Sequence, residues 1–226
     1  MWRKRKQSSG YEVSIYMRHF TRENIDGLEK FFRASLINSI TGIKPANLIG
    51  TQNQAGLTNL AIFTSVVHLG SNPPLLGMIF RPVGEVQRHT YQNIQQHKKY
   101  TINALPADQT KAGHYTSAKF EEEESEFEQC GFTPSYVKGF DAPFVEESPL
   151  RIGLTWVEEI PIKRNQTILM IGEVEHLMVD EGALSQEGYL NLEKLQVAGV
   201  SGLNSYYRLH KENDYPYARK TDWPNI

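Results

Sequence analysis

The sequence predicts a mainly β fold with peripheral helices, of the α+β class, in which an antiparallel sheet closes into a barrel. About six or seven segments have the apolar pattern and the length of strands, whereas only two or three show helical periodicity. Strands and helices do not alternate in the strict order of a parallel α/β sheet. No GxGxxG sequence follows the first strand, which argues against a Rossmann domain.

The first predicted element is a helix that follows a polar tail. Thr21 is a suitable N-cap, and apolar residues recur at helical spacing from Ile25 to about Ser39. Gly42 and Pro45 then end the helix.

Three strands are predicted next. They cover residues 46–51, 58–69 and 75–80, with a turn at 53–56 and a break at Asn72-Pro73-Pro74. Both faces of the 58–69 segment are largely apolar. We therefore expect this strand to be central in the sheet or covered on both sides.

The second half of the chain continues the mixed pattern. It predicts a helix over 91–99, a strand over 100–105, two short helices within 107–140 with a turn at 131–134, an alternating strand from 150 to 156, a turn at 161–165 and a long strand over 166–179.

Length and composition favour one globular domain. The chain has 226 residues, enough for one large or two small domains, but no repeat or Pro/Gly/Ser-rich linker divides it. We expect a basic, polar tail over 1–20 and a single domain over 21–226. Four of the 24 basic residues lie within positions 3–6, so the body is mildly acidic, which argues against a nucleic-acid surface.

The single cysteine is typical of a protein from a reducing compartment, and the spacing of the histidines predicts no metal site. Cys130 is the sole cysteine and cannot form an internal disulfide, and no histidine pair has HxxxH spacing. The basic N-terminus lacks the apolar region of a signal peptide, and the most apolar stretch, 59–80, is interrupted by His68, Asn72 and two prolines. We expect a cytoplasmic protein without a membrane segment.

The stretch that begins at Arg88 is the first candidate site. If Thr90 is the N-cap of the 91–99 helix, unpaired N–H groups point outward, and Arg88 with His89 adds positive charge beside a hydroxyl. Arg81 ends the preceding strand and adds another cation. These are the properties of a phosphate site, although Thr and Arg also occur at helix starts for capping alone.

The strand from Thr58 to Ser65 is the second candidate. Hydroxyl and amide side chains on a buried apolar strand need hydrogen-bond partners. A flat heteroaromatic ligand would offer such partners to Thr58, Asn59 and the strand backbone. The alternative is that Thr64 and Ser65 bond to neighbouring backbone in a tight barrel. His114, before the acidic run 121–124, is a candidate acid, base or cofactor contact, with a solvated surface histidine as the alternative.

An ordered series of segments resembles the flavin reductase family, whose fold is the FMN-binding split barrel. The series comprises Lys44-Pro45-Ala46-Asn47-Leu48-Ile49-Gly50-Thr51, Thr58-Asn59-Leu60-Ala61-Ile62-Phe63-Thr64-Ser65, Ser71-Asn72-Pro73-Pro74, Arg88-His89-Thr90-Tyr91-Gln92-Asn93, Thr101-Ile102-Asn103, Ser125-Glu126-Phe127-Glu128 and Gly131-Phe132-Thr133. The match covers roughly residues 33–185 in order and spacing.

The resemblance implies positions for the cofactor. It places the isoalloxazine ring against the strand from Thr58 to Ser65, with Asn59, Leu60 and Ala61 at its edge. It implies that the FMN phosphate is held by Arg88, His89, Thr90 and Asn93. Relatives often have Lys in place of Arg88, and an acidic or another small polar residue in place of His89. His114 and Ser117 are expected to border a nicotinamide pocket. The resemblance also implies a homodimer with FMN near the subunit interface.

The implied function is hydride transfer from NAD(P)H to flavin, in which the protein supplies stacking, orientation and exclusion of water rather than a general base. Reduced flavin would then pass electrons to free flavin, oxygen, a metal chelate or a partner oxygenase. The alternatives are an FMN-binding electron-transfer protein without NAD(P)H activity of its own, and a barrel-type binding module without flavin.

Overall fold

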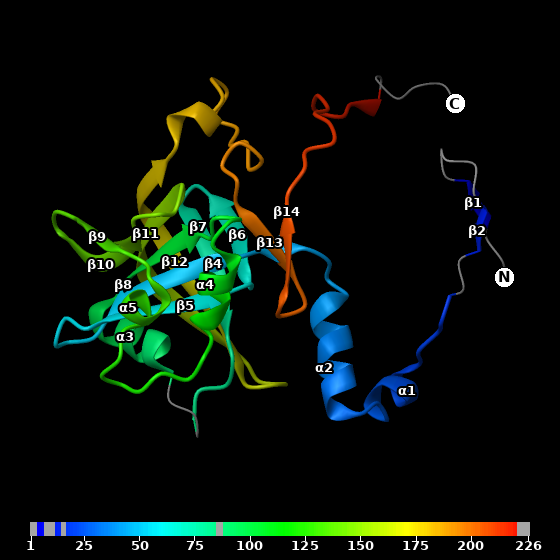
Figure 1. Cartoon of the computed structure of the whole chain (residues 1–226), viewed down its shortest axis with the longest axis horizontal. Helices are drawn as coiled ribbons and strands as arrows, with labels where there is room; N and C mark the ends of the chain where they lie inside the picture. The colour runs from blue at the N-terminus through cyan, green and yellow to red at the C-terminus, as the bar shows by residue number, and fades with distance from the viewer. Residues whose placement is uncertain (1–3, 7–11, 15–16, 85–87, 221–226) are drawn as a thin grey trace.

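The computed structural model of the chain describes residues 4–6, 12–14, 17–84 and 88–220. Its main body is a barrel of antiparallel strands with short helices at one side, and a helical arm near the N-terminus stands apart from the barrel (Figure 1). The predicted mainly β fold with peripheral helices is confirmed.

One seven-stranded sheet forms the barrel, in the order β5-β4-β8-β11-β12-β7-β6. All of its neighbouring strands are antiparallel. The strands are β4 (Asn47–Gln52), β5 (Thr58–Phe63), β6 (Val66–Ser71), β7 (Pro74–Phe80), β8 (Lys99–Ala104), β11 (Leu150–Ile162) and β12 (Thr167–Val179).

Three smaller sheets complete the β structure. They are the hairpin β1 (Lys4–Lys6) with β2 (Glu12–Ser14), the hairpin β9 (Pro134–Val137) with β10 (Phe140–Val145), and a sheet of β3 (Lys44–Pro45), β13 (Ala198–Ser201) and β14 (Ser205–Arg208). The sequence pattern predicted none of these three sheets, because their strands are short and carry few alternating apolar residues.

The helices are α1 (Arg22–Asp26), α2 (Lys30–Ser39), α3 (His89–His97), α4 (Thr110–Tyr115) and α5 (Glu126–Cys130), with a 3₁₀ turn η1 (Glu181–Ala183). The two short helices expected within 107–140 are confirmed as α4 and α5. No helix in the described part of the chain is long and apolar enough to span a membrane.

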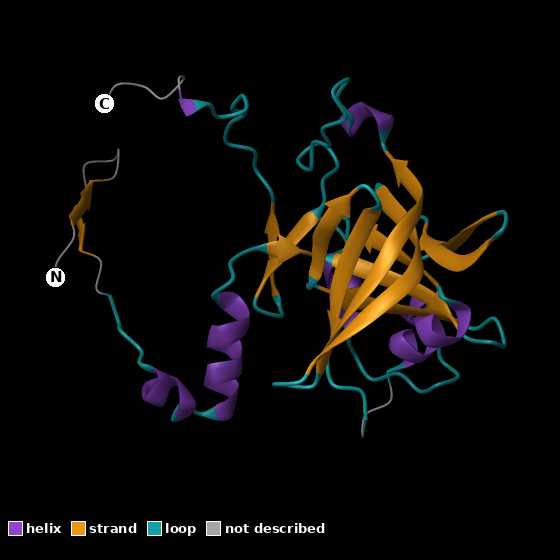
Figure 2. Cartoon of the chain, turned by 180° about the vertical axis from the view of Figure 1, so that it is seen from behind, coloured by secondary structure: helices purple, strands orange, loops and turns teal. Residues whose placement is uncertain are grey.

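The predicted N-terminal helix is two helices. Thr21 caps α1 through a capping box with Asn24, as its sequence position predicted. Gly27 ends this helix, and α2 begins afresh with Glu29 as its N-cap. Neither helix has a buried residue, and Figure 2 shows both lying outside the barrel.

The prediction of one strand over 58–69 is wrong. The chain breaks at Thr64 and Ser65, and the resulting strands β5 and β6 lie at opposite ends of the seven-stranded order. The break arises because the Ser65 hydroxyl bonds both the N–H and the carbonyl of Ile79. Helices α3, α4 and α5 contact β5, whereas β6 keeps exposed apolar residues.

The break predicted at Asn72-Pro73-Pro74 is confirmed as a tight hairpin. Ser71 of β6 pairs directly with Pro74 of β7, so only two residues connect the strands. The Asn72–Pro73 peptide bond is cis.

The barrel interior is a continuous apolar cluster. Its fully or almost fully buried members are Ile49, Met78, Phe80, Ile94, Tyr100, Ile102, Leu154, Ile168 and Met170. Ile94 belongs to α3, so this helix is anchored to the barrel by packing as well as by polar contacts.

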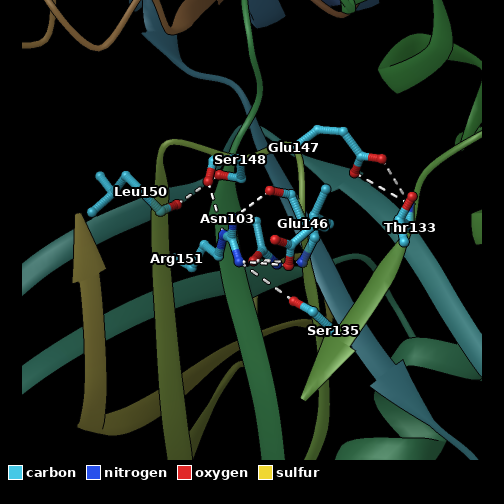
Figure 3. A network of polar contacts seen from close by, with 9 residues as sticks. Asn103, Thr133, Ser135, Glu146, Glu147, Ser148, Leu150 and Arg151 are labelled. Carbon is cyan, nitrogen blue, oxygen red and sulfur yellow. Dashed lines mark hydrogen bonds and ion pairs between the residues drawn. The ribbon is translucent and has the colours of Figure 1, made fainter. Parts of the chain in front are cut away.

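A polar network fastens β10 and the segment after it to the barrel (Figure 3). The Asn103 side chain donates to the Leu48 carbonyl over 3.1 Å and accepts from the Val145 N–H over 3.0 Å. Arg151 donates from Nε to the Ser148 carbonyl over 2.9 Å. The members satisfy one another, so we assign this network to the fold rather than to ligand binding.

Candidate functional site

Helix α3 begins two residues before the predicted start at Tyr91. Its first residue is His89 and its N-cap is Arg88, so the prediction of Thr90 as N-cap is wrong. Thr90 is buried inside the first turn, where its hydroxyl accepts from the side chain of Asn59 over 3.0 Å. Its hydroxyl is thus used for tertiary contact instead of capping.

The first turn of α3 lies on the sheet through a buried polar cluster of Thr51, Asn59, Thr90 and Asn93. Asn59 Nδ2 donates to Thr51 Oγ1 over 3.3 Å as well as to Thr90. Asn93 Nδ2 also donates to Thr51 Oγ1, over 3.1 Å. All four side chains are at most 7% exposed. The cluster joins β4 and β5 to the helix start.

Within the described part of the chain, unpaired backbone N–H groups and the positively charged Arg88 lie together at the start of α3. The first N–H groups of a helix have no intrahelical partner, and no side chain of the described residues caps those of α3. The Arg88 Nε is buried and has no hydrogen-bond partner among the described residues. An uncapped helix N-terminus with a guanidinium beside it fits a phosphate group.

A small pocket opens between β5 and the first turn of α3. It is lined by Asn53, Leu57, Thr58, Asn59, His89, Gln92, Asn93, Glu122 and Glu124. The structure therefore brings together four of the predicted cofactor residues, Thr58, Asn59, His89 and Asn93. The acidic run 121–124 is a loop and places Glu122 and Glu124 on the pocket wall.

Helix α5 covers the outer edge of β5. The carboxylate of Glu126 accepts from the Leu60 N–H over 2.9 Å, and the hydroxyls of Ser125 and Thr58 lie 2.6 Å apart. Burial raises the pKa of Glu126 above its ordinary value of 4.5, although the Leu60 N–H and nearby His89 act to lower it. The Leu60 N–H, expected at a flavin edge, is therefore already engaged.

The other predicted β5 residues differ in their surroundings. Ala61 is half-buried and pairs with Ile49 of β4. Thr64 is half-buried at the break between β5 and β6. The Ser65 hydroxyl bonds the backbone of Ile79, which confirms for this residue the alternative of a bond to neighbouring backbone.

Arg81 lies at the end of β7 and is exposed. The preceding residue, Phe80, packs edge-on against Tyr91 of α3 with ring centroids 5.5 Å apart. Arg81 is therefore close in the chain to a residue that contacts α3, but it does not line the pocket described above.

His114 and Ser117 lie together at the end of α4, away from the lining of that pocket. The His114 Nδ1 is 3.2 Å from the Tyr206 hydroxyl, and its ring contacts Tyr115 and Tyr206 edge-on. Ser117 is exposed and donates to the His114 carbonyl. The imidazole is held by aromatic neighbours instead of being solvated on all sides.

Comparison with known proteins decides the family. The model of the flavin reductase like domain matches residues 43–196. The chain belongs to this family. A Shewanella frigidimarina split-barrel structure, assigned as a flavin reductase, is 45% identical, with 89% of this chain and all of that one covered and a TM-score of 0.86.

Two further matches are more distant. Nitrilotriacetate monooxygenase component B of Bacillus cereus is 19% identical, covers 89% of this chain and 100% of its own, and has a TM-score of 0.78. An uncharacterized protein of Halalkalibacterium halodurans is 26% identical over 188 residues, which are 81% of this chain and 90% of that protein. The first of these shows the shared fold.

Several residues at the site of this flavin reductase-like chain were missed by sequence reasoning. The sequence pattern places Thr51 in a strand and gives it no role at the site, although it is fully buried and accepts two side-chain hydrogen bonds. Glu126 lies within a segment that resembles the family, but the sequence does not indicate its bond to Leu60. The available signal was a polar residue in an otherwise apolar context, which requires a partner but does not identify it.

Proposed function

We propose that this chain is an FMN-binding flavin reductase that transfers a hydride from NAD(P)H to flavin. The observation that carries the proposal is the meeting of β5 with the uncapped first turn of α3 at one pocket. The helix start and Arg88 supply positive potential for a phosphate, and the strand beside them supplies a surface for a ring. Membership of the flavin reductase like family supports the same assignment.

The phosphate end of FMN would be held by the backbone N–H groups of the α3 first turn together with Arg88 and His89. Thr90 and Asn93 would act through the buried polar cluster, because their side chains are already bonded to Asn59 and Thr51. This arrangement separates the groups that touch the phosphate from those that hold the helix.

The ring would lie along β5 from Thr58 to Ala61. When bound, FMN supplies the acceptor for the hydride. The chain contributes orientation and exclusion of water, and the Leu60 N–H remains with Glu126 unless α5 moves. His114 and Ser117 are proposed to border the nicotinamide.

The second candidate is an FMN-binding electron-transfer protein without NAD(P)H activity. The observation that favours it is that neither His114 nor Ser117 lines the pocket between β5 and α3. An oxygenase that consumes reduced flavin is a proposed partner, supported by the likeness to a monooxygenase component. A cytoplasmic location is also proposed, since the single Cys130 is a free thiol.

The test is the absorbance spectrum of the purified protein with FMN, recorded without oxygen before and after each nucleotide. Bleaching of the flavin by NADH or NADPH supports the reductase. Bound flavin that is reduced by dithionite but by neither nucleotide supports the electron-transfer protein. A colourless protein that does not take up added FMN contradicts both the reductase and the electron-transfer protein. That result would favour the third alternative, a barrel-type binding module that holds no flavin.

We further propose that the chain forms a homodimer through the outer face of β6, β7, β12 and β11. Register places Val67, Gly77 and Ile171 on one face, opposite the interior Met78 and Met170. The exposed apolar residues of this outer apolar face are Val67, Leu69, Ile160 and Ile162. A strand with apolar residues on both faces is expected to have both faces covered by other parts of the protein. Within its described part, the chain itself covers only the inner face of β6.

The occupant we assign to this face is a second copy of the chain, including its α2 arm. Phe31 is 77% exposed and Ile40 is 66% exposed, and α2 has no buried residue. The basic Lys30 of α2 complements the exposed Glu158 of β11. Two apolar surfaces on one chain can thus cover each other between two copies.

Light scattering coupled to gel filtration tests the dimer. The wild-type protein is expected at twice the chain mass of 25.8 kDa. Ile160→Lys is expected to give the monomer, whereas Leu184→Lys, at an exposed leucine after η1, should leave the dimer intact. A monomeric wild type, or a dimer unchanged by Ile160→Lys, would overturn the assignment.

A further inference from the structure

We infer that Thr51 is a positioning residue for the phosphate end of the flavin site; the inference rests on the proposed function. Thr51 lies on β4, is fully buried and does not line the pocket. Its hydroxyl oxygen is the shared acceptor for two amide groups that do line the pocket, those of Asn59 and Asn93.

The two amides belong to the two halves of the proposed site. Asn59 is on β5, the strand proposed for the ring, and Asn93 is on α3, the helix proposed for the phosphate. Asn59 also donates to Thr90 on the same helix. Thr51 therefore couples the ring strand to the phosphate helix without contacting the ligand.

Removal of the Thr51 hydroxyl would take one hydrogen bond from the amide of Asn59 and one from the amide of Asn93. Asn59 keeps its bond to Thr90, but Asn93 loses the one acceptor that its Nδ2 has among the described residues. A buried amide without an acceptor is costly, so the first turn of α3 is expected to move until water or another group satisfies Asn93. The N–H groups at the helix start would move with it.

Thr51→Val tests this role, because valine has nearly the same shape as threonine and lacks the hydroxyl. The probes are FMN and riboflavin, which share the ring but differ in the phosphate. We expect Thr51→Val to weaken FMN binding about tenfold, the loss expected for one or two hydrogen bonds, and to change riboflavin binding by less than about threefold. Thr51→Ser restores the hydroxyl and should return FMN affinity to within about threefold of wild type.

Thr101→Val is the matched control. Thr101 is also a fully buried threonine of the barrel, but its hydroxyl donates to the Pro143 carbonyl and accepts from Asn103, neither of which belongs to α3. This variant is expected to lose stability without a change in the ratio of FMN to riboflavin affinity. It separates general loosening of the barrel from loss of the helix position.

Amide hydrogen exchange supplies a readout that does not depend on flavin. Thr51→Val should speed exchange at residues 90–94 and leave β11 and β12 unchanged. If Thr51→Val does not fold, Thr51→Ala is measured in the same two ways, with the same expected results.

The outcomes divide the inference from the proposed function. A wild-type protein that binds FMN no better than riboflavin, or binds neither, overturns the proposed phosphate site and the inference with it. A wild type that prefers FMN, with the same preference kept in Thr51→Val, overturns the inference alone. Equal loss of both ligands in Thr51→Val also overturns it, because that result indicates general loosening.

Discussion

The carboxylate of Glu126 accepts a hydrogen bond of 2.9 Å from the backbone N–H of Leu60. This bond closes the outer edge of β5, the last strand of the seven-stranded order on that side. An edge strand with free N–H groups can pair with other chains or with ligands. In this flavin reductase-like protein the edge at Leu60 is instead held by the first residue of α5.

Two substitutions of Glu126 are expected to distinguish the contribution of its hydrogen bond to stability from the contribution of its charge. Glu126→Ala leaves the buried Leu60 N–H without an acceptor and should lower the free energy of unfolding by about 1–3 kcal/mol. Glu126→Gln keeps an acceptor oxygen and should cost much less at neutral pH. Urea unfolding of the three proteins measures both values.

The pH dependence of the same variants follows from the raised pKa of Glu126, whose main cause is burial. A raised pKa in the folded state means that this group stabilises the fold most below its unfolded value of 4.5, and that the contribution is lost as pH rises through the folded value. The stability of Glu126→Gln relative to wild type should therefore increase with pH above 4.5. A pH-independent difference between the two proteins would contradict a buried, titrating carboxyl.

The local pattern of apolar residues was sufficient to predict the secondary-structure elements that bury one regular face. It predicted the β7 strand and the tight turn at Pro73, because apolar periodicity and proline geometry are properties of neighbouring residues. It failed at Ser65, where a hydroxyl bond to Ile79, 14 residues away, breaks a segment that reads as one strand. It also predicted Thr90 as the N-cap of α3, since the competing bond from Asn59 is not visible locally.

The same limit applies to the candidate site. The sequence identified His89 and Asn93 as phosphate candidates, and the structure places them on one pocket with Asn59. Thr51 and Glu126 could not be identified, because the bond from Asn93 to Thr51 spans 42 residues and the bond from Leu60 to Glu126 spans 66. Such contacts depend on the packing of α3 and α5 on the sheet.

Arg88→Ala should weaken FMN binding by about 1.5–3 kcal/mol if the side chain makes a charge-assisted bond to the phosphate. Riboflavin binding should be almost unchanged, because riboflavin lacks the phosphate. Arg81→Ala, at the exposed end of β7, is expected to have a smaller effect through its more screened charge. Fluorescence titration of both ligands measures the difference, and an unchanged FMN affinity in Arg88→Ala would place the phosphate elsewhere.

The Tyr206 hydroxyl and the His114 Nδ1 are 3.2 Å apart, and this contact orients the proposed nicotinamide residue. Tyr206→Phe keeps the edge-on ring contact and removes the bond. We expect the KM for the reduced nucleotide to rise about threefold to tenfold, the effect of one hydrogen bond, while the Kd for FMN is unchanged. Steady-state kinetics at saturating FMN provides the comparison, and a change in the FMN Kd alone would assign His114 to the flavin instead.

The acidic loop over the pocket should oppose the binding of a phosphate. Glu122 lines the same pocket as His89 and Asn93, so its carboxylate repels a nearby dianion. Glu122→Gln is isosteric and should tighten FMN binding by about twofold to fivefold at low salt, the effect of one partly screened charge, with less gain at high salt.

Glu123→Gln is the matched control for this effect. Glu123 is the next residue of the same run and is exposed, but it does not line the pocket. Its substitution changes the net charge equally and should leave FMN affinity within the error of the titration. Equal tightening in both variants would indicate a general effect of net charge, whereas tightening toward riboflavin as well as FMN would show that Glu122 acts on the ring end and not on the phosphate.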